Sequence, residues 1–110
     1  MTIDKKTFAA LQEMAGAEFV VELVHAFFEE APVMLATLTS SLAQGDAETF
    51  RRTAHSLKSN SNTFGAQELA AIAKDLELSG LEKVRARPDP LGAVGAEYQR
   101  VASALKELTA

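Results

Sequence analysis

Cysteine is absent from this chain of 110 residues, which excludes disulfides, thiolate nucleophiles and zinc sites built on cysteine. Long hydrophobic runs are missing as well. The most apolar stretch, residues 19–35, is interrupted by acidic side chains, by His25 and by Pro32. It falls short of the roughly 18 uninterrupted apolar residues that mark a membrane span. Polar residues also follow soon after the N-terminus, where a signal peptide needs an apolar core. We therefore predict no membrane contact and a cytoplasmic location.

Positive charge is in short supply. Lys and Arg together number 11, whereas Asp and Glu number 15, so the formal net charge is −4. Binding to the phosphate backbone of DNA or RNA depends on an excess of clustered cations, so we predict no nucleic-acid partner. The remaining composition, 47% hydrophobic and 24% charged, is typical of a folded globular domain. A chain this short forms a single domain, over residues 1–110.

Glycine and proline are few, with 6 and 3 residues respectively, and they cluster at a few places. A short helix that begins at Asp4 and ends near Met14 is the first predicted element. Beyond it, apolar residues recur every three or four positions, the period of an amphipathic helix, in the segments 17–44, 50–64, 69–79 and 91–108. Each apolar stripe has to be buried, and short connections make neighbouring helices antiparallel. The sequence therefore predicts an all-α fold, an antiparallel up-and-down four-helix bundle with a short extra N-terminal helix.

Two local details stay open at this point. The apolar stripe remains in phase across Pro32, so residues 17–44 form either two helices in line or one helix kinked at the proline. Residues 81–90 are predicted to form a loop. Within it, Arg85 and Arg87 either contact a partner or belong to a solvated connection, and we favour the connection.

One of the two histidines, His25, is surrounded at helical spacing by Glu18, Glu22 and Glu29. Carboxylates and an imidazole at such spacings can share a metal ion. However, one face of one helix supplies few ligands, and no second histidine-containing segment faces it. We favour a solvated histidine and predict no metal site. A metal-binding bundle also needs inward-facing Glu and His ligands, and the apolar stripes contain none.

The other histidine, His55, points about 140° away from the apolar stripe of its helix and therefore outward. Its neighbours at helical spacing are Arg51, Lys58, Ser59 and Asn62. A neutral imidazole is a nucleophile near neutral pH, and adjacent cations stabilise the oxygens of an incoming phosphoryl group. This combination suits phosphoryl transfer onto nitrogen. A surface histidine beside cations is also common without any function, so spacing alone leaves both interpretations open.

The segment from Ala54 to Ala66, AHSLKSNSNTFGA, resembles the phosphorylated motif of histidine-containing phosphotransfer (HPt) domains. In that motif Ala-His-x-Leu-Lys-Gly/Ser is followed by small residues and then by Gly-Ala. The resemblance extends to the Glu-Phe pair at residues 18–19, the Gly-Asp turn at residues 45–46 and the Leu-Glu pair at residues 76–77. It covers nearly the whole chain in order, and its motif is far more specific than a lone surface histidine.

The resemblance implies that His55 takes a phosphoryl group on Nε2 from an aspartyl phosphate of a receiver domain and passes it to another receiver domain. It also implies that Lys58 lies near the phosphoryl oxygens. Glu77 occupies the place of a family residue that accepts a hydrogen bond from Nδ1–H of the imidazole. Such a bond fixes the tautomer and leaves Nε2 free. For Glu77, an ordinary exposed carboxylate is an equally good interpretation.

Two positions on the face of His55 depart from the family pattern. Ser59 stands where glycine is frequent, although it remains small, and Asn62 stands where the family prefers Gly or Ala. Together with Arg51, these residues are expected to contact the docking partner. We expect Asn62 to affect the choice of partner more than phosphorylation itself.

No glycine-rich nucleotide-binding loop is present, so we do not expect the chain to phosphorylate itself from ATP. The resemblance then implies a phosphorelay carrier, and it stays open whether this intermediate counts as an enzyme. No cofactor of its own is expected, whereas Mg²⁺ is expected in the partner. The expected partners are receiver domains of a hybrid sensor kinase and of a response regulator, bound by a monomer. The alternative is a helical adaptor that docks receiver domains without phosphorylation, for which a histidine is not needed.

Overall fold

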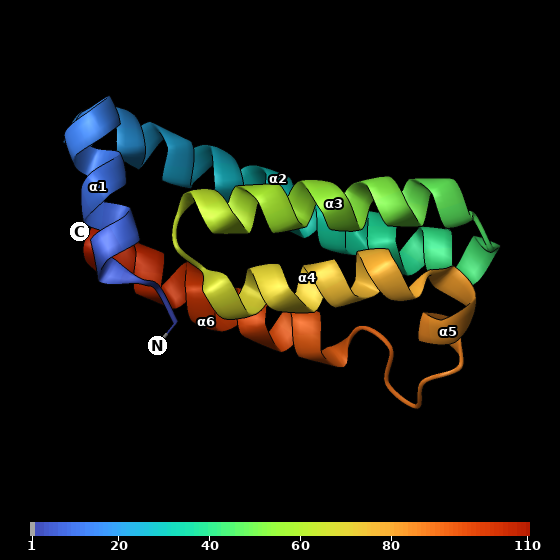
Figure 1. Ribbon diagram of the computed structural model, residues 1–110. Coiled ribbons are helices and arrows are strands. Elements are labelled where there is room, and N and C mark those ends of the chain that lie inside the picture. The colour runs from blue at the N-terminus through green and yellow to red at the C-terminus, as the bar shows by residue number, and fades with distance from the viewer. Residues whose placement is uncertain (1) are drawn as a thin grey trace.

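The computed structural model describes residues 2–110, and all regular structure in these residues is helical (Figure 1). The helices follow one another along the chain as α1 (Lys5–Ala15), α2 (Ala17–Gln44), α3 (Ala47–Thr63), α4 (Gln67–Ser79), α5 (Leu81–Arg85) and α6 (Gly92–Leu108).

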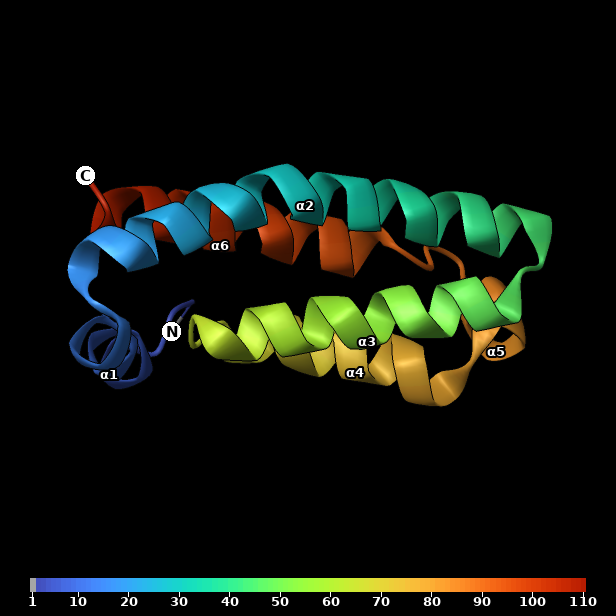
Figure 2. The same ribbon diagram turned by 90° about the horizontal axis from the view of Figure 1, so that it is seen from above.

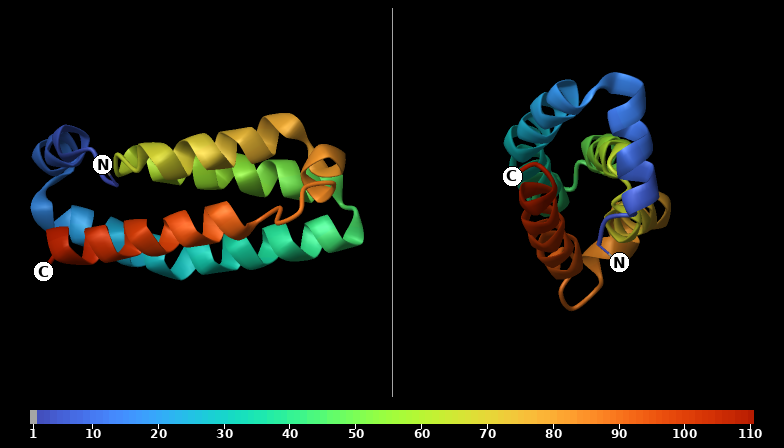
Figure 3. Two further views of the ribbon diagram at one scale, coloured as in Figure 1. Left: turned by 90° about the horizontal axis from the view of Figure 1, so that it is seen from below. Right: turned by 90° about the vertical axis from the view of Figure 1, so that its left-hand side faces the viewer.

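The helices α2, α3, α4 and α6 lie side by side and alternate in direction, so they form an antiparallel bundle (Figure 1). Helix α3 packs against α2 and α4, and α6 packs against α2 and α4 on the other side of the bundle (Figure 3). Helix α1 lies across one end (Figure 2), and the whole measures 41 × 22 × 19 Å. This arrangement confirms the predicted fold class. Within residues 2–110, none of the helices is long and apolar enough to cross a membrane.

The core lies where the predicted apolar stripes meet. On α3 the stripe formed by Phe50, Ala54 and Leu57 is completely buried. The ring of Phe27 on α2 lies 5.3 Å from that of Phe64 and 5.8 Å from that of Tyr98 on α6, measured between centroids, and so joins three parts of the bundle. Because the inner face of α3 is fixed by these contacts, its opposite face is turned to solvent along the whole helix.

Helix α2 runs through Pro32 as one helix of 28 residues. Proline removes one backbone hydrogen bond and normally breaks a helix. Here Ala31 and Leu38 are both fully buried, whereas Pro32 itself is exposed. Packing of the stripe on both sides of the proline therefore outweighs the lost hydrogen bond, and the alternative of two separate helices is wrong.

Residues 81–90 contain a short helix, α5, where the sequence predicted only a loop. Five residues are too few to show a helical period. Arg85 donates from Nε and Nη2 to the carbonyl oxygen of Leu42, at 3.3 and 2.7 Å, and so satisfies a carbonyl at the end of α2. Arg87 pairs with Asp75 on α4, with Nη1 2.7 Å from Oδ2. Both arginines thus attach the connecting segment to the bundle. Their role in the structure is to hold this segment in place, and it does not form a free partner-binding loop.

One carboxylate contradicts the expectation that the apolar stripes contain no inward-facing acid. Glu97 on α6 is 3% exposed. Val94 and Val101 lie three residues before it and four residues after it, so Glu97 belongs to the stripe, a signal that the sequence did contain. Its Oε1 accepts a hydrogen bond from Nε of Arg100 at 2.7 Å. A buried carboxylate needs such a partner, and the exposed guanidinium provides it.

The ends of α3 are fixed in two different ways. At its start, the Asp46 side chain accepts a hydrogen bond from the backbone N–H of Thr49 at 3.2 Å and caps the helix. After its end, Gly65 has φ +79° and its carbonyl accepts from the backbone N–H of Asp4 at 2.8 Å. A Cβ at Gly65 would lie 2.9 Å from the Asp4 carbonyl oxygen. Glycine is therefore required both for the turn and for the close approach of the N-terminal segment.

Candidate functional site

His55 lies in the middle of α3, on the face opposite to the core. Its neighbours Ala54 and Leu57 are fully buried, whereas 54% of the His55 side chain is exposed. The sequence prediction that this imidazole points into solvent is confirmed. A partner molecule therefore has direct access to the ring.

The imidazole is held by a carboxylate on the neighbouring helix. Nδ1 of His55 lies 2.9 Å from Oε2 of Glu77 near the end of α4. An ionised carboxylate only accepts hydrogen bonds, so Nδ1 carries the proton and donates it. The Glu77 side chain is 12% exposed, which excludes the alternative of an ordinary exposed carboxylate. Among the residues that the structure describes, none makes a hydrogen bond to Nε2, and this nitrogen is left with its lone pair.

Lys58 completes the cluster from one turn further along α3. Its Nζ lies 3.0 Å from Oε1 of Glu77, and 24% of its side chain is exposed. Oε1 is enclosed by protein and makes no well-directed hydrogen bond within residues 2–110, so the ammonium contact is an ion pair. Glu77 therefore has one oxygen turned to the ring of His55 and the other turned to Lys58.

The electrostatics of this cluster keep Glu77 ionised. The Lys58 ammonium and, to a lesser degree, the His55 N–H hold the pKa of Glu77 below its ordinary value, although partial burial acts in the opposite direction. An ionised carboxylate is the stronger hydrogen-bond acceptor for Nδ1–H. The cluster is therefore suited to hold the imidazole in one orientation and one tautomer.

The predicted partner-binding residues share the face of His55, and within residues 2–110 none of them is hydrogen-bonded to its ring. Arg51 donates from Nη2 to Glu48 at 2.8 Å, and this contact raises the pKa of the guanidinium further. Ser59 and Asn62 are exposed, and neither side chain makes a hydrogen bond to another described residue. The structure thus brings together His55, Lys58 and Glu77, and it leaves the other three predicted residues free of the imidazole on an open surface.

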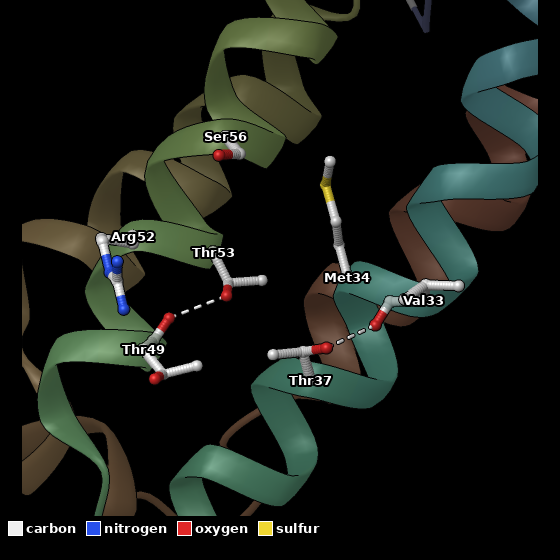
Figure 4. A pocket seen from close by; sticks show the side chains of 7 residues that line it. All are labelled: Val33, Met34, Thr37, Thr49, Arg52, Thr53 and Ser56. Carbon is white, nitrogen blue, oxygen red and sulfur yellow. Dashed lines mark hydrogen bonds between the residues drawn. The ribbon is translucent and has the colours of Figure 1, made fainter.

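An open groove of about 390 Å³ lies between α2 and α3 (Figure 4). The hydroxyl groups of Thr37 and Thr53 are bonded to carbonyl oxygens of their own helices, at 2.9 and 2.7 Å. The groove is lined by residues of both helices, namely Val33, Met34, Thr37, Thr49, Arg52, Thr53 and Ser56. Ser56 directly follows His55 along α3, and its side chain points about 100° away from that of His55, so the groove lies on the flank of α3 that faces α2.

No pattern in the sequence predicted this groove. Val33 is 64% exposed and lies outside the apolar stripe of α2. An apolar residue off the stripe is only a weak signal, because single apolar residues are common on protein surfaces. It did not show which helix would lie opposite, because that depends on how α2 and α3 pack.

His25 lies on the exposed face of α2, away from this cluster. Its ring is 6.4 Å from that of Phe28, between centroids. Within the described part of the chain, no three His, Asp or Glu side chains gather closely enough to hold a metal ion. The acidic neighbours of His25 therefore form a solvated helix face.

Comparisons with known proteins show which proteins this chain is similar to. Residues 22–108 match the family model described as the Hpt domain. Among solved structures, the chain is similar to histidine-containing phosphotransfer protein B (HptB) from Pseudomonas aeruginosa, with 32% sequence identity and a TM-score of 0.87. The similarity covers 98% of this chain and 94% of that chain. No significant match is found among curated protein sequences.

Proposed function

The chain belongs to the Hpt domain family, and on this premise we propose that it is a phosphorelay carrier that accepts a phosphoryl group on Nε2 of His55. The donor is an aspartyl phosphate on a receiver domain of a hybrid sensor kinase, and the acceptor is the receiver domain of a response regulator. The observation that carries the proposal is the exposed imidazole whose Nδ1 lies 2.9 Å from the Glu77 carboxylate. This contact leaves Nε2 as the nucleophile.

In the uptake step, the lone pair of Nε2 attacks the phosphorus of the aspartyl phosphate. The N–P bond forms while the bond from phosphorus to the aspartate oxygen breaks, and that electron pair leaves with the aspartate. The ring becomes a phosphoimidazolium that keeps its proton on Nδ1. The Glu77 carboxylate balances the positive charge of this ring. In the release step, the carboxylate of the second receiver attacks the phosphorus, and the neutral imidazole leaves.

The carrier supplies only part of what phosphoryl transfer needs. Transfer requires positive charge beside the phosphoryl oxygens and an in-line arrangement of the attacking and leaving atoms. We assign the Mg²⁺ to the receiver domain, whose own carboxylates hold it. The chain contributes the nucleophile, the orientation of its ring and a docking surface that includes Arg51, Ser59 and Asn62.

An adaptor that only docks receiver domains is the other candidate function. It would use the same exposed face of α3, but it has no need of a charged residue on α4 that fixes the tautomer of a histidine on α3. The His55–Glu77 contact therefore favours chemistry over docking alone.

The test uses purified receiver domains phosphorylated with radiolabelled acetyl phosphate in the presence of Mg²⁺. Each is incubated with the wild-type chain and with His55→Gln. We expect acid-labile, base-stable label on the wild-type chain and none on the variant, with both chains showing the same helical circular dichroism. Label on His55→Gln would show that another residue is the acceptor. Receiver domains that bind the wild-type chain without transferring label would establish the adaptor function.

A further inference from the structure

A second hollow opens in the seam between α2 and α3, closer to the C-terminal end of α3 than the groove of Figure 4. It has a volume of about 210 Å³. Its lining includes Glu30 on α2 and Asn60 on α3, which lie one helical turn beyond Val33 and Ser56 of the groove. The two hollows therefore follow one another along the same flank of α3, beside the face that carries His55.

Most residues that line this second hollow are apolar. Leu23 and Ala26 are partly buried, and the deeper Phe27 and Phe64 are 2% and 4% exposed. The volume is below the roughly 300–1,000 Å³ of a typical small-molecule pocket. The hollow therefore suits one long side chain of a partner protein, whose aliphatic stem can lie along the apolar walls.

Two polar groups at the hollow have no partner within the chain. Glu30 is exposed, and its carboxylate forms no ion pair or hydrogen bond within residues 2–110. Asn60 is partly buried, and its side-chain amide makes no hydrogen bond to another described residue. The hydroxyl of Thr63, by contrast, is bonded to the Ser59 carbonyl oxygen at 3.1 Å. A carboxylate and an amide are therefore available to a ligand that enters the hollow.

We propose that this hollow is the binding site for an arginine side chain of the docking receiver domain, whose guanidinium is held by Glu30 and Asn60. The planar guanidinium can donate to the Glu30 carboxylate and to the amide oxygen of Asn60 at the same time. A lysine ammonium lacks this fork and fits the two acceptors less well. The identity of the partner as a receiver domain rests on the proposed function.

The charges along the seam also set the direction in which the partner docks. Among the described residues, Arg52 is the one charged side chain that lines the groove of Figure 4, whereas Glu30 is the one that lines the second hollow. Arg52 is loosely paired, with its Nε 3.6 Å from Oε1 of Glu48. A partner that brings a cation to Glu30 and an anion to Arg52 is attracted in this orientation and repelled in the reverse one.

The first experiment measures binding of purified, unphosphorylated receiver domains by isothermal titration calorimetry, and it continues with the receiver that binds the wild-type chain most tightly. We expect Glu30→Gln to weaken binding roughly 10-fold, because it removes the charge that strengthens the hydrogen bond. Glu29→Gln is the matched control, since Glu29 is exposed on the same helix and does not line the hollow. It should leave the affinity unchanged. Equal affinities of the two variants would overturn the proposal.

The second experiment identifies the partner side chain by exchanging charges. Each exposed arginine and lysine of that receiver is replaced by glutamate in turn. We expect one arginine substitution to weaken binding to the wild-type chain and to regain affinity with Glu30→Arg, because opposite charges then meet again. If no position were rescued, or only a lysine position, the assignment of the hollow to an arginine would be wrong.

A substitution that leaves the charge unchanged tests whether the hollow itself is occupied. Ala26→Leu fills part of the hollow, whereas Ala36→Leu adds the same side chain at an exposed position of α2 outside it. We expect Ala26→Leu to weaken receiver binding and Ala36→Leu to leave it unchanged, with the same helical circular dichroism in both. Full affinity of Ala26→Leu would show that Glu30 acts only as a surface charge, and the site would not exist.

Phosphorylation distinguishes failure of this proposal from failure of the proposed function. Phosphoramidate is a small donor that needs no receiver domain. A wild-type chain that takes no label from phosphoramidate or from phosphorylated receivers, although binding still depends on Glu30, would refute the phosphorelay function and leave the arginine site intact. A chain that takes label normally, and whose Glu30→Gln variant binds receivers as tightly as the wild type, would refute the arginine site alone.

Discussion

The two flanks of α3 differ in the contacts that they provide around the exposed His55. Toward α4, polar atoms are matched in pairs: Nδ1 of His55 meets one oxygen of Glu77 and Lys58 meets the other. Toward α2, an open groove lies beside Ser56, and Val33 is 64% exposed at its edge. On the α4 flank the chain itself provides the partners of His55 and Lys58, whereas the α2 flank is an open groove with Val33 and Met34 among mainly polar lining residues. We infer that the α4 flank orients the ring and that the α2 flank belongs to docking.

Substitutions on the two flanks of α3 should therefore have different consequences. A change on the α4 flank should alter the reactivity of the imidazole toward every phosphoryl donor. A change on the α2 flank should matter only when the donor is a protein that has to dock. Small-molecule and protein donors therefore separate the two roles.

The largest effect is expected from Glu77→Ala on the α4 flank. Loss of the acceptor for Nδ1–H releases the ring and removes the charge that balances the phosphoimidazolium, so we expect phosphorylation to slow roughly 10- to 100-fold. The loss should be similar with a phosphorylated receiver and with phosphoramidate, as measured by initial rates of label uptake. If only the receiver reaction slowed, Glu77 would belong to the docking surface and the division between the flanks would fail.

A smaller effect is expected from Val33→Glu on the α2 flank. The new carboxylate places a bulkier, negatively charged side chain in the groove that we expect the receiver to contact, and disturbing a contact of this kind costs about 1–2 kcal/mol of binding. Transfer from a receiver should therefore slow about 10-fold at subsaturating concentration, since 1.4 kcal/mol corresponds to about a factor of ten. Phosphorylation by phosphoramidate should not change.

The matched control for this substitution is Met14→Glu. Met14 is 82% exposed on α1, so it offers an apolar side chain of comparable exposure at the far end of the molecule. We expect it to leave both reactions unchanged. Equal slowing by the two substitutions would show that added negative charge, rather than the groove, is what disturbs the encounter.

The predictability of the site differs between the flanks for a physical reason. Periodicity along one helix was enough to place His55 in solvent and Lys58 one turn away. The contact between His55 and Glu77 joins residues 22 positions apart, and it depends on how α3 and α4 align. Only the family resemblance suggested it. The groove depends in the same way on how α2 and α3 pack, and no motif in the sequence marked Val33.

The fold was more predictable than the site because burial follows local periodicity. The apolar stripes are buried where the three- and four-residue spacing placed them. The exceptions have identifiable causes. Helix α5 is too short for a period to appear, and Pro32 is tolerated because packing on both sides keeps α2 straight enough to continue. Glu97 was not predicted to be buried, because a charged residue is not counted among the apolar positions of a stripe. Its burial is possible because Arg100 donates a hydrogen bond to its carboxylate.

A third prediction concerns pH and the α4 flank. The pKa of Glu77 is lower in the folded chain than its ordinary value, so the folded state binds a proton there less readily than the unfolded state. The stabilisation from Glu77 is therefore complete above the ordinary carboxylate pKa of about 4.3. It is lost as the pH falls through the lower folded value. We expect the difference in free energy of unfolding between wild type and Glu77→Gln to shrink as the pH falls into the acid range.

Denaturant titrations of both proteins across this pH range measure that difference directly. Comparing the two chains cancels the contributions of other carboxylates, such as Asp75, whose pKa is also lowered by its contact with Arg87. A difference that grew on acidification would mean that Glu77 is more easily protonated in the folded state. In that case the ammonium of Lys58 would not be the dominant influence on this carboxylate.

The smallest effect is expected from Asn62→Ala, two turns along α3 from His55. The side chain of Asn62 is exposed and makes no hydrogen bond to another described residue, so its removal should leave the phosphoramidate reaction and the stability nearly unchanged, within about 0.5 kcal/mol. It lies on the face that a receiver must approach, where the family prefers a smaller residue. We therefore expect the ratio of transfer rates between different receiver domains to shift by a few-fold, since a rim contact contributes little to affinity but helps to discriminate between partners. Equal changes in the transfer rate with all receivers would place Asn62 among the general docking residues. A change in the rate of phosphorylation by phosphoramidate would instead mean that Asn62 helps to orient the imidazole. The two flanks of α3 would then no longer have separate roles.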